Sequence, residues 1–318
     1  MNRKRLFIYV LCGVLMIGYL YYEYASHPVY KGQKTIGATY MTMNNDFYKI
    51  INEEIEKAAD LHGDVVYARD AMLDSQSQVA QIYDFVAKEC DAIIINPVEA
   101  NSQELNAALT FAHSRGIKIV AVDSQLTDTS AIDCTIVSDN YEAGCQCARD
   151  MMAIMKKATI LLLEHQSAMS AVDRIKGFED TIKTHDSYQI VDRRDCQGQT
   201  ENALSVVDDV VRDGIRFDVI MALNDPSALG AIASIKKNQL SYAPVVYGVD
   251  GSPDVKKLIA STDEIRGTSA QTPVTMGQEA IETAYQMLAG EAVEETVTIP
   301  VFMITKDNID QYLVAGWQ

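Results

Sequence analysis

The sequence predicts an α/β protein made of two similar halves, each built around a parallel β-sheet. Short apolar runs alternate with segments whose apolar residues recur at helical spacing, and this alternation is typical of βαβ units. The run from Ala243 to Val249 ends at Asp250-Gly251, and Ser252-Pro253 then supplies a cap and a first turn for a helix. Strands that are joined through helices lie parallel, so we expect parallel sheets in both halves.

The first half is predicted to begin after a short tether, residues 24–33. Its strands are expected at residues 35–41, 65–68, 92–95, 117–122 and 134–137. Three helices separate them, at residues 46–61, 75–88 and 102–114. The helix at 46–61 shows the pattern well, because Phe47, Ile50, Ile51, Ile55 and Ala58 fall on one face.

The second half repeats this alternation. Its strands are predicted at residues 159–163, 189–191, 219–223, 245–249, 265–270 and 297–304. Its helices are predicted at residues 141–155, 171–184, 201–212, 227–237 and 276–288, with a further short helix at 306–313. Each half therefore has about the size of one domain.

The N-terminal residues predict a membrane anchor. Arg3, Lys4 and Arg5 precede an uncharged run from Leu6 to Tyr22, which spans about 25 Å as a helix at ~1.5 Å per residue. The basic flank predicts a cytoplasmic N-terminus and an extracytoplasmic remainder. Residues 1–33 are thus interpreted as basic flank, single-pass anchor and tether, with a cleaved signal peptide as the alternative.

Composition excludes several classes of function. The formal net charge of −17 in 318 residues argues against a nucleic-acid partner, whose phosphates require Lys and Arg. No phosphate-binding loop, dinucleotide fingerprint or zinc-protease helix occurs, so we expect neither an enzyme nor a cofactor. The five cysteines after the anchor have no zinc-site spacing, and the histidines are interpreted as surface or ordinary helix residues, so no metal site is expected.

Polar residues follow several of the predicted strands. Asp123 comes after residues 117–122, Asn224 and Asp225 come after residues 219–223, and Asp250 ends the strand described above. Ligands of open α/β sheets bind at the carboxyl ends of the strands. We therefore expect Asp123 and Asp250 to contact a ligand. We expect Asp225 to cap the following helix instead.

A series of short motifs carries a family resemblance. They are Met41 to Tyr48, Ile95-Asn96-Pro97, Val122-Asp123-Ser124, Arg174 to Phe178, Leu223-Asn224-Asp225, Gly248 to Asp254 and Ala270 to Pro273. In this order and at these separations, the chain from residue 34 to residue 318 resembles the ribose-binding-protein-like periplasmic sugar-binding proteins of type I. The resemblance implies two doubly wound lobes joined by hinge strands, with a sugar between them.

The same resemblance implies the boundaries of the lobes. The chain would cross between them near Ser138, Gln271 and Pro300. The N-terminal lobe would comprise residues 34–137 and 272–298, and the C-terminal lobe residues 138–271 and 299–318.

Site residues also follow from the resemblance. Phe47 and Tyr48 would provide aromatic faces for a sugar ring, and Arg174 would offer a planar fork to neighbouring hydroxyls. The polar residues around the ring edge would be Asn45, Asp123, Asn224, Asp250 and Gln271. Ser124, which we also expect to contact the ligand, stands where ribose binders of the family usually have Arg. Val249 replaces an aromatic residue, and Cys196 is the nearest counterpart of a stacking aromatic. Another pentose, a hexose, a polyol or a sugar-like signal therefore fits as well as ribose.

The implied function is delivery of a small carbohydrate to an ABC importer. The alternative is a membrane-anchored sugar-sensing subunit whose closed form contacts a sensor histidine kinase. A glycosidase that uses Asp123 and Asp250 fits less well, because similar placement on opposite lobes suits hydroxyl binding better. The related bacterial repressors have a DNA-binding head in the place of this chain's anchor.

Overall fold

The computed structural model describes residues 32–318, and the predicted anchor with its basic flank lies outside the described residues. Thr35–Gln318 form one compact unit. Within the described part of the chain, no helix combines the length and the apolar character that crossing a bilayer requires.

The N-terminal lobe is built on a six-stranded sheet in the order β11-β5-β4-β3-β1-β2. All of its pairings are parallel. The strands are β1 (Thr35–Tyr40), β2 (Val65–Asp70), β3 (Ala92–Ile95), β4 (Lys118–Val122), β5 (Cys134–Ser138) and β11 (Thr296–Ile299). Its helices are α2 (Asp46–His62), α3 (Ser75–Ala87), α4 (Gln103–Ser114) and α10 (Pro273–Leu288).

The C-terminal lobe has a second six-stranded sheet in the order β12-β10-β9-β8-β6-β7. Its strands are β6 (Ala158–Glu164), β7 (Tyr188–Asp195), β8 (Val219–Ala222), β9 (Val245–Asp250), β10 (Gly267–Ala270) and β12 (Phe302–Thr305). Its helices are α5 (Asn140–Ile154), α6 (Met169–Ile182), α7 (Thr200–Arg212), α8 (Asp225–Asn238) and α9 (Pro253–Ser261), followed by the 3₁₀ turn η1 (Ile309–Gln311). Only β12, at the edge of this sheet, runs antiparallel to its neighbour.

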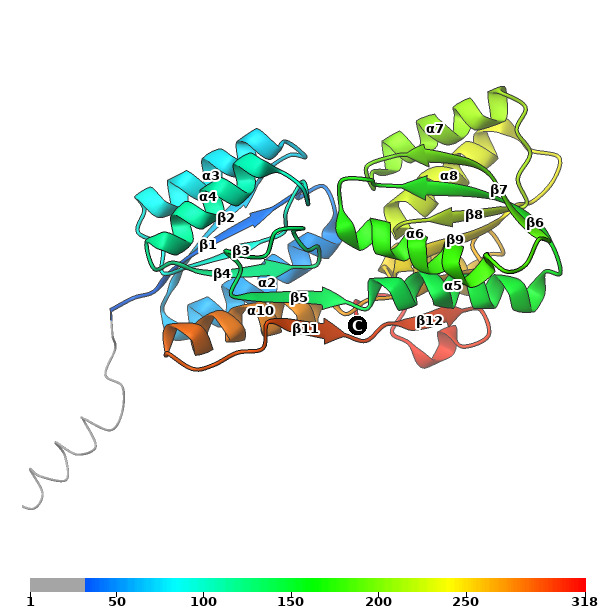
Figure 1. Ribbon diagram of the computed structural model, residues 1–318. Coiled ribbons are helices and arrows are strands. Elements are labelled where there is room, and N and C mark those ends of the chain that lie inside the picture. Colours follow the sequence, from blue (N-terminus) through cyan, green and yellow to red (C-terminus); the bar gives the residue numbers. More distant parts are fainter. Residues whose placement is uncertain (1–31) are drawn as a thin grey trace, which may run out of the picture. The chain divides into compact units, whose positions relative to one another are not determined.

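Helices cover both faces of each sheet, as expected for doubly wound lobes (Figure 1). In β3, Ile93 and Ile95 pack into one cluster with α3 and α4, whereas Ile94 packs into the cluster on the opposite face. A strand that is buried on both faces must be apolar throughout, which explains the continuous apolar run at this position. The five cysteines of residues 32–318 are buried and unpaired.

The chain passes between the two sheets three times within residues 35–318. The passages follow β5, β10 and β11, since α5 packs on the second lobe and α10 on the first. β11 pairs with β5 up to Ile299, and β12 begins at Phe302 in the other sheet. Pro300 and Val301 therefore form the third passage.

Three predicted elements were wrong in extent. The single strand predicted at 297–304 is two strands in different sheets, separated at Pro300, which has no backbone N–H for a ladder. The helix predicted at 306–313 is only η1, because the Asn308 side chain bonds the backbone of Met303 and Thr305 and forms a turn. The strand predicted at 189–191 extends to Asp195, since charged residues are accommodated on this sheet edge.

Candidate ligand-binding site

Two aspartates stand at matching strand ends, one in each lobe. Asp123 directly follows β4, and Asp250 is the last residue of β9. Both are buried and have positive φ angles, 65° for Asp123 and 137° for Asp250. Residues other than glycine seldom adopt such angles, and strain of this kind gathers at binding sites. The backbone thus presents two buried carboxylates in equivalent positions.

Both carboxylates line one small hollow, to which both lobes contribute side chains. Eight of the nine residues predicted from the sequence line it: Asn45, Phe47, Tyr48, Asp123, Arg174, Asn224, Asp250 and Gln271. The ninth, Ser124, is buried beside the hollow, where its Oγ accepts a hydrogen bond from the Ser170 backbone N–H at 3.3 Å. The sequence motifs therefore converge on one place in the fold.

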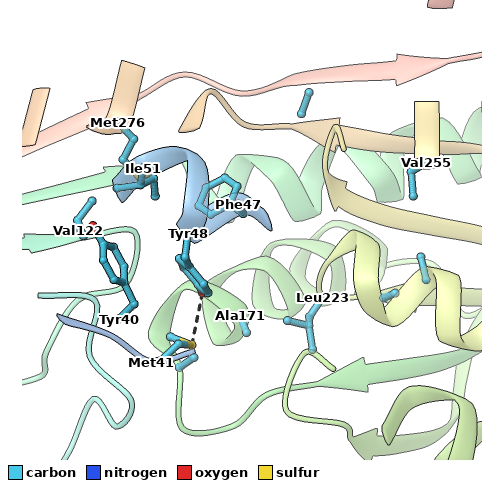
Figure 2. Close-up of a cluster of buried hydrophobic side chains, with 14 of the residues drawn as sticks. Tyr40, Met41, Phe47, Tyr48, Ile51, Val122, Ala171, Leu223, Val255 and Met276 are labelled. Carbon is cyan, nitrogen blue, oxygen red and sulfur yellow. Dashed lines mark hydrogen bonds between the residues drawn. The ribbon is translucent and has the colours of Figure 1, made fainter. Parts of the chain in front are cut away.

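The aromatic wall of the hollow comes from the first turn of α2. Phe47 and Tyr48 meet edge to face, with ring centroids 5.6 Å apart and an interplanar angle of 85°. The Tyr48 hydroxyl donates to Asp123 at 3.3 Å and also lies 3.4 Å from the Met41 sulfur (Figure 2). The two rings are perpendicular, so they do not present a parallel pair of faces. Asn45 caps this helix by accepting from the Phe47 N–H.

Arg174 reaches the hollow from α6 and lies between the two aspartates. Its Nε donates to Asn140 at 2.8 Å, and its Nη1 donates to the Leu223 carbonyl at 3.1 Å. Nη1 lies 3.8 Å from Asp250 and Nη2 lies 3.7 Å from Asp123, both too far for a hydrogen bond. Nη2 is buried and has no hydrogen-bond partner among the described residues. The N–H groups of Nη2 are thus available to a ligand.

Gln271 provides an unpaired acceptor to match this donor. Its Nε2 donates to Asp250 at 2.8 Å, while its Oε1 is buried without a partner among residues 32–318. Asn224 is more fully occupied, since its Oδ1 accepts from the Ser227 N–H at 3.0 Å and its Nδ2 donates to the Gly198 carbonyl at 3.1 Å. Buried polar atoms without partners are costly, so they point to groups that a ligand supplies.

Burial shifts the titration of both aspartates. Loss of hydration raises the pKa of Asp123, and the nearby Arg174 charge opposes this rise. Loss of hydration also raises the pKa of Asp250 well above its usual range, and repulsion from the Asp225 carboxylate adds to it. The carboxylate of Asp250 is therefore the less stable of the two in its ionised form.

The expectation for Asp225 was wrong. Asn224, not Asp225, caps α8. The fully buried Asp225 carboxylate instead accepts from the Ser252 N–H at the start of α9 and from the Thr268 hydroxyl of β10, both at 2.7 Å. It braces the strand ends behind Asp250, because a side chain directly after a parallel strand can reach the next strand as easily as its own helix.

The expectation for His165 was also wrong. It is 5% exposed and lines the hollow, with its Nε2 3.0 Å from the Ser167 Oγ. Burial lowers its pKa, which favours a neutral ring. His165 directly follows β6, so the strand-end rule that selected Asp123 and Asp250 would have found it. Other lining residues that sequence analysis missed are Met41, Thr42, Ala168, Ser170, Ala171, Gln197, Gly198, Gln199 and Leu223.

The lobes touch around the hollow. The Ala100 N–H donates to the Ser167 carbonyl at 3.0 Å, and the Asn44 side chain donates to Gln199 at 3.1 Å. The site is therefore covered by contacts between the lobes in this conformation. Across residues 32–318, no three His, Cys, Asp or Glu side chains are arranged to hold a metal ion.

Comparisons with known proteins agree with this architecture. The ribose import binding protein RbsB of Bacillus subtilis is 28% identical over 279 residues, covering 87% of this chain and 88% of that protein. The xylitol-binding protein of Mycolicibacterium smegmatis is 28% identical over 284 residues, covering 87% and 78% respectively.

A solved structure gives the same picture. An ABC transporter solute binding protein from Agrobacterium vitis, with bound D-fucose, matches with a TM-score of 0.81 at 25% identity, covering 87% of this chain and 97% of that one. The family model for the periplasmic binding protein domain matches residues 36–292. Because that model spans most of the chain, this protein belongs to the periplasmic binding protein domain family.

Proposed function

We propose that this chain is an extracytoplasmic solute-binding protein that takes a small sugar or polyol between its lobes and delivers it to an ABC importer. In this proposal the segment Leu6 to Tyr22 anchors the chain in the cell membrane as a single span. The binding unit then stands outside the cytoplasm, where a permease receives its ligand. The relatives named for ribose, xylitol and D-fucose support this class of ligand.

One observation carries the proposal: two side chains that line the same hollow hold a buried donor and a buried acceptor that have no hydrogen-bond partner among residues 32–318. Arg174 Nη2 is the donor and Gln271 Oε1 is the acceptor. A hydroxyl group can form hydrogen bonds with both, since it accepts from a guanidinium and donates to an amide oxygen or a carboxylate. Asp123 and Asp250 add further acceptors, and Phe47 and Tyr48 add apolar surface for C–H groups. A neutral, hydroxyl-rich ring or chain matches this set of groups.

Binding would proceed by hinge closure. The site takes Asp123 from the N-terminal lobe and Arg174, Asp250 and Gln271 from the C-terminal lobe, so a ligand gains its full set of contacts only when the lobes are together. The ligand then shifts an open–closed equilibrium through its higher affinity for the closed state. We propose residues 34–137 with 272–298 and residues 138–271 with 299–318 as the moving bodies. Ser138 and Ile299, which pair at the ends of β5 and β11, lie at the boundary between them.

The test is thermal unfolding of the full chain with a panel of pentoses, hexoses, cyclitols and polyols. A ligand at ~100 times its Kd adds roughly 2.7 kcal/mol to the free energy of unfolding. For a chain of this size, the Tm should rise by roughly 4–5 °C. The rise should vanish in Arg174→Ala and persist in Arg194→Ala, whose arginine pairs with Asp192 on the sheet edge. No rise with any compound of the panel would contradict the proposal.

The identity of the protein partner distinguishes delivery to an importer from sensing. Co-purification of the full chain from detergent extracts should yield a permease and an ATPase. Recovery of a sensor histidine kinase instead would replace the transport role with the sensing role, while leaving the ligand class unchanged.

A further inference from the structure

The last residues of the described chain are held by a buried lysine. Lys256, in α9, is fully buried, and its ammonium group donates to the carbonyls of Leu313 and Gly316 and to the Gln318 Oε1, at 2.8, 2.5 and 2.8 Å. An ammonium group has three N–H donors, and all three are used here. We call residues Leu313–Gln318 the strap.

Further contacts fix the strap to the C-terminal lobe. At one end, Gln318 Nε2 donates to the Gly251 carbonyl at 3.1 Å, directly after the site residue Asp250. Just before the strap, Tyr312 stacks on Phe302 of β12, with centroids 5.3 Å apart and an interplanar angle of 9°. The strap therefore moves with the C-terminal lobe.

Trp317 extends from the strap to the other lobe. Its ring lies 5.9 Å from that of Phe47, at an interplanar angle of 70°, and Phe47 belongs to α2 of the N-terminal lobe. Phe47 lines the ligand hollow, and Trp317 lines an adjoining one that also includes Asn45 and Asp250. An edge-to-face pair thus joins the two lobes directly behind an aromatic ring of the site.

We propose that Trp317 is a positioning residue of the ligand site. Lys256 fixes the strap, the strap places Trp317 against Phe47, and this contact holds the Phe47 ring toward the ligand when the lobes are closed. The inference rests on the proposed carbohydrate-binding function and deepens it. Because the pair joins the two lobes, it forms when the lobes close and separates when they open. Loss of the pair should therefore change the rate of ligand release.

Trp317 is the single tryptophan of the sequence, so its fluorescence reports this ring alone. We expect that D-ribose, xylitol or D-fucose, whichever raises the Tm of the full chain, also reduces acrylamide quenching of Trp317 in the wild-type protein. Calorimetric titration with the same compound should give a Kd roughly tenfold higher for Trp317→Ala, the upper end of what an aromatic pair contributes. The Tm without ligand should change little.

The matched control is Tyr242→Ala, which removes an edge-to-face contact with Phe217 that lies within the C-terminal lobe and involves no residue of the strap. It should lower the Tm without ligand and leave the Kd near the wild-type value. Gln318→Ala, which loosens the strap without emptying a buried position, should raise the Kd in the same direction as Trp317→Ala but less. This split between Kd and Tm separates positioning from a merely structural role.

Two failures are distinguishable. If no compound raises the wild-type Tm, the proposed function fails and the inference fails with it. If the wild type binds a sugar and Trp317→Ala binds it equally well, with quenching unchanged by the sugar in the wild type, the function stands and the role of Trp317 is overturned.

Discussion

The two lobes present the same residue at the same place, but they surround it differently. In the N-terminal lobe, Asp123 is held by neutral donors, the Tyr48 hydroxyl at 3.3 Å and the Asn96 amide at 3.2 Å. In the C-terminal lobe, Asp250 accepts from the Gln271 amide at 2.8 Å and from the Asp225 N–H at 3.4 Å, but repulsion from the buried Asp225 carboxylate adds to the rise of its pKa. Both carboxylates thus have neutral donors, whereas only Asp250 faces a second buried carboxylate of its own lobe.

This difference shows how the work of binding is divided. The N-terminal lobe offers a preformed wall of aromatic rings and a carboxylate whose partners are in place. Among the described side chains that line the hollow, the two atoms without hydrogen-bond partners belong to the C-terminal lobe, Arg174 Nη2 and Gln271 Oε1, as does the carboxylate that faces a second buried carboxylate. Polar atoms that are buried without partners lower the stability of the protein alone, and ligand hydroxyls would supply those partners, which is the usual trade-off between stability and function.

The largest expected effect comes from removing the cation shared by the two aspartates. Arg174→Ala should lower ligand affinity at least ~100-fold and reduce the free energy of unfolding by ~3–5 kcal/mol, because it leaves buried carboxylates without their partner. The loss should be greater at pH 8 than at pH 5, where protonation relieves it. Denaturant unfolding at both pH values measures this. Equal losses at the two pH values would contradict the account.

The paired substitutions Asp123→Asn and Asp250→Asn test the comparison itself. Each should weaken binding roughly 10- to 100-fold, as expected for a hydrogen bond to a charged group. Their effects on the protein without ligand should differ in size. Burial raises the pKa of both aspartates, so each substitution should relieve an unfavourable charge at pH 8, and Asp250→Asn should stabilise more because it also removes the repulsion from Asp225. If both change the free energy of unfolding equally, the two lobes do not differ as described.

The dependence of stability on pH sharpens the comparison. Burial raises the pKa of Asp225 to about 6. A carboxyl whose pKa is raised on folding contributes stability that is complete below its unfolded value near 3.8 and is lost as the pH rises through about 6. Stability without ligand should therefore fall between about pH 4 and pH 7 more steeply in the wild type than in Asp225→Asn. Burial lowers the pKa of His165, which acts in the opposite direction in both proteins, so the difference between their Tm curves is the quantity to measure.

The smallest effect is expected at Ser124. Its Oγ accepts from the Ser170 N–H of the other lobe, so it acts when the lobes are closed. Ser124→Ala should raise the Kd by only about three- to tenfold, the value of one neutral hydrogen bond, with little change in the unliganded Tm. Calorimetric titration of the variant and of the wild type with the same ligand measures this change in Kd. A loss as large as that of Asp123→Asn would mean that Ser124 contacts the ligand directly.

Most of the fold and much of the site followed from local patterns. Parallel strands that are buried on both faces produce apolar runs with sharp ends, and the polar residue after each run marked the site, as at Asp123 and Asp250. The length of edge strand β7 was underestimated, because charged residues, Asp192 to Asp195, occupy both faces of its second half. That Asn224 rather than Asp225 caps α8 was missed, since it depends on the distance from Asp225 to the neighbouring strand β10.

Contacts between residues far apart in the sequence could not be predicted. Phe47 and Trp317 meet only because both lobes and the Lys256-bound strap are in place. Sequence spacing contains no information on such a pair.

The central claim is that hydroxyl groups of the ligand form hydrogen bonds with the two unpaired atoms of the C-terminal lobe, Arg174 Nη2 and Gln271 Oε1. A crystal structure of this chain with the compound that raises its Tm most tests this directly. The account predicts one hydroxyl oxygen within about 3.2 Å of Arg174 Nη2 and another within the same distance of Gln271 Oε1, with Asp123 and Asp250 bonded to the same molecule. A ligand bound in this hollow that leaves both atoms unpaired, or one bound outside it, would contradict the account.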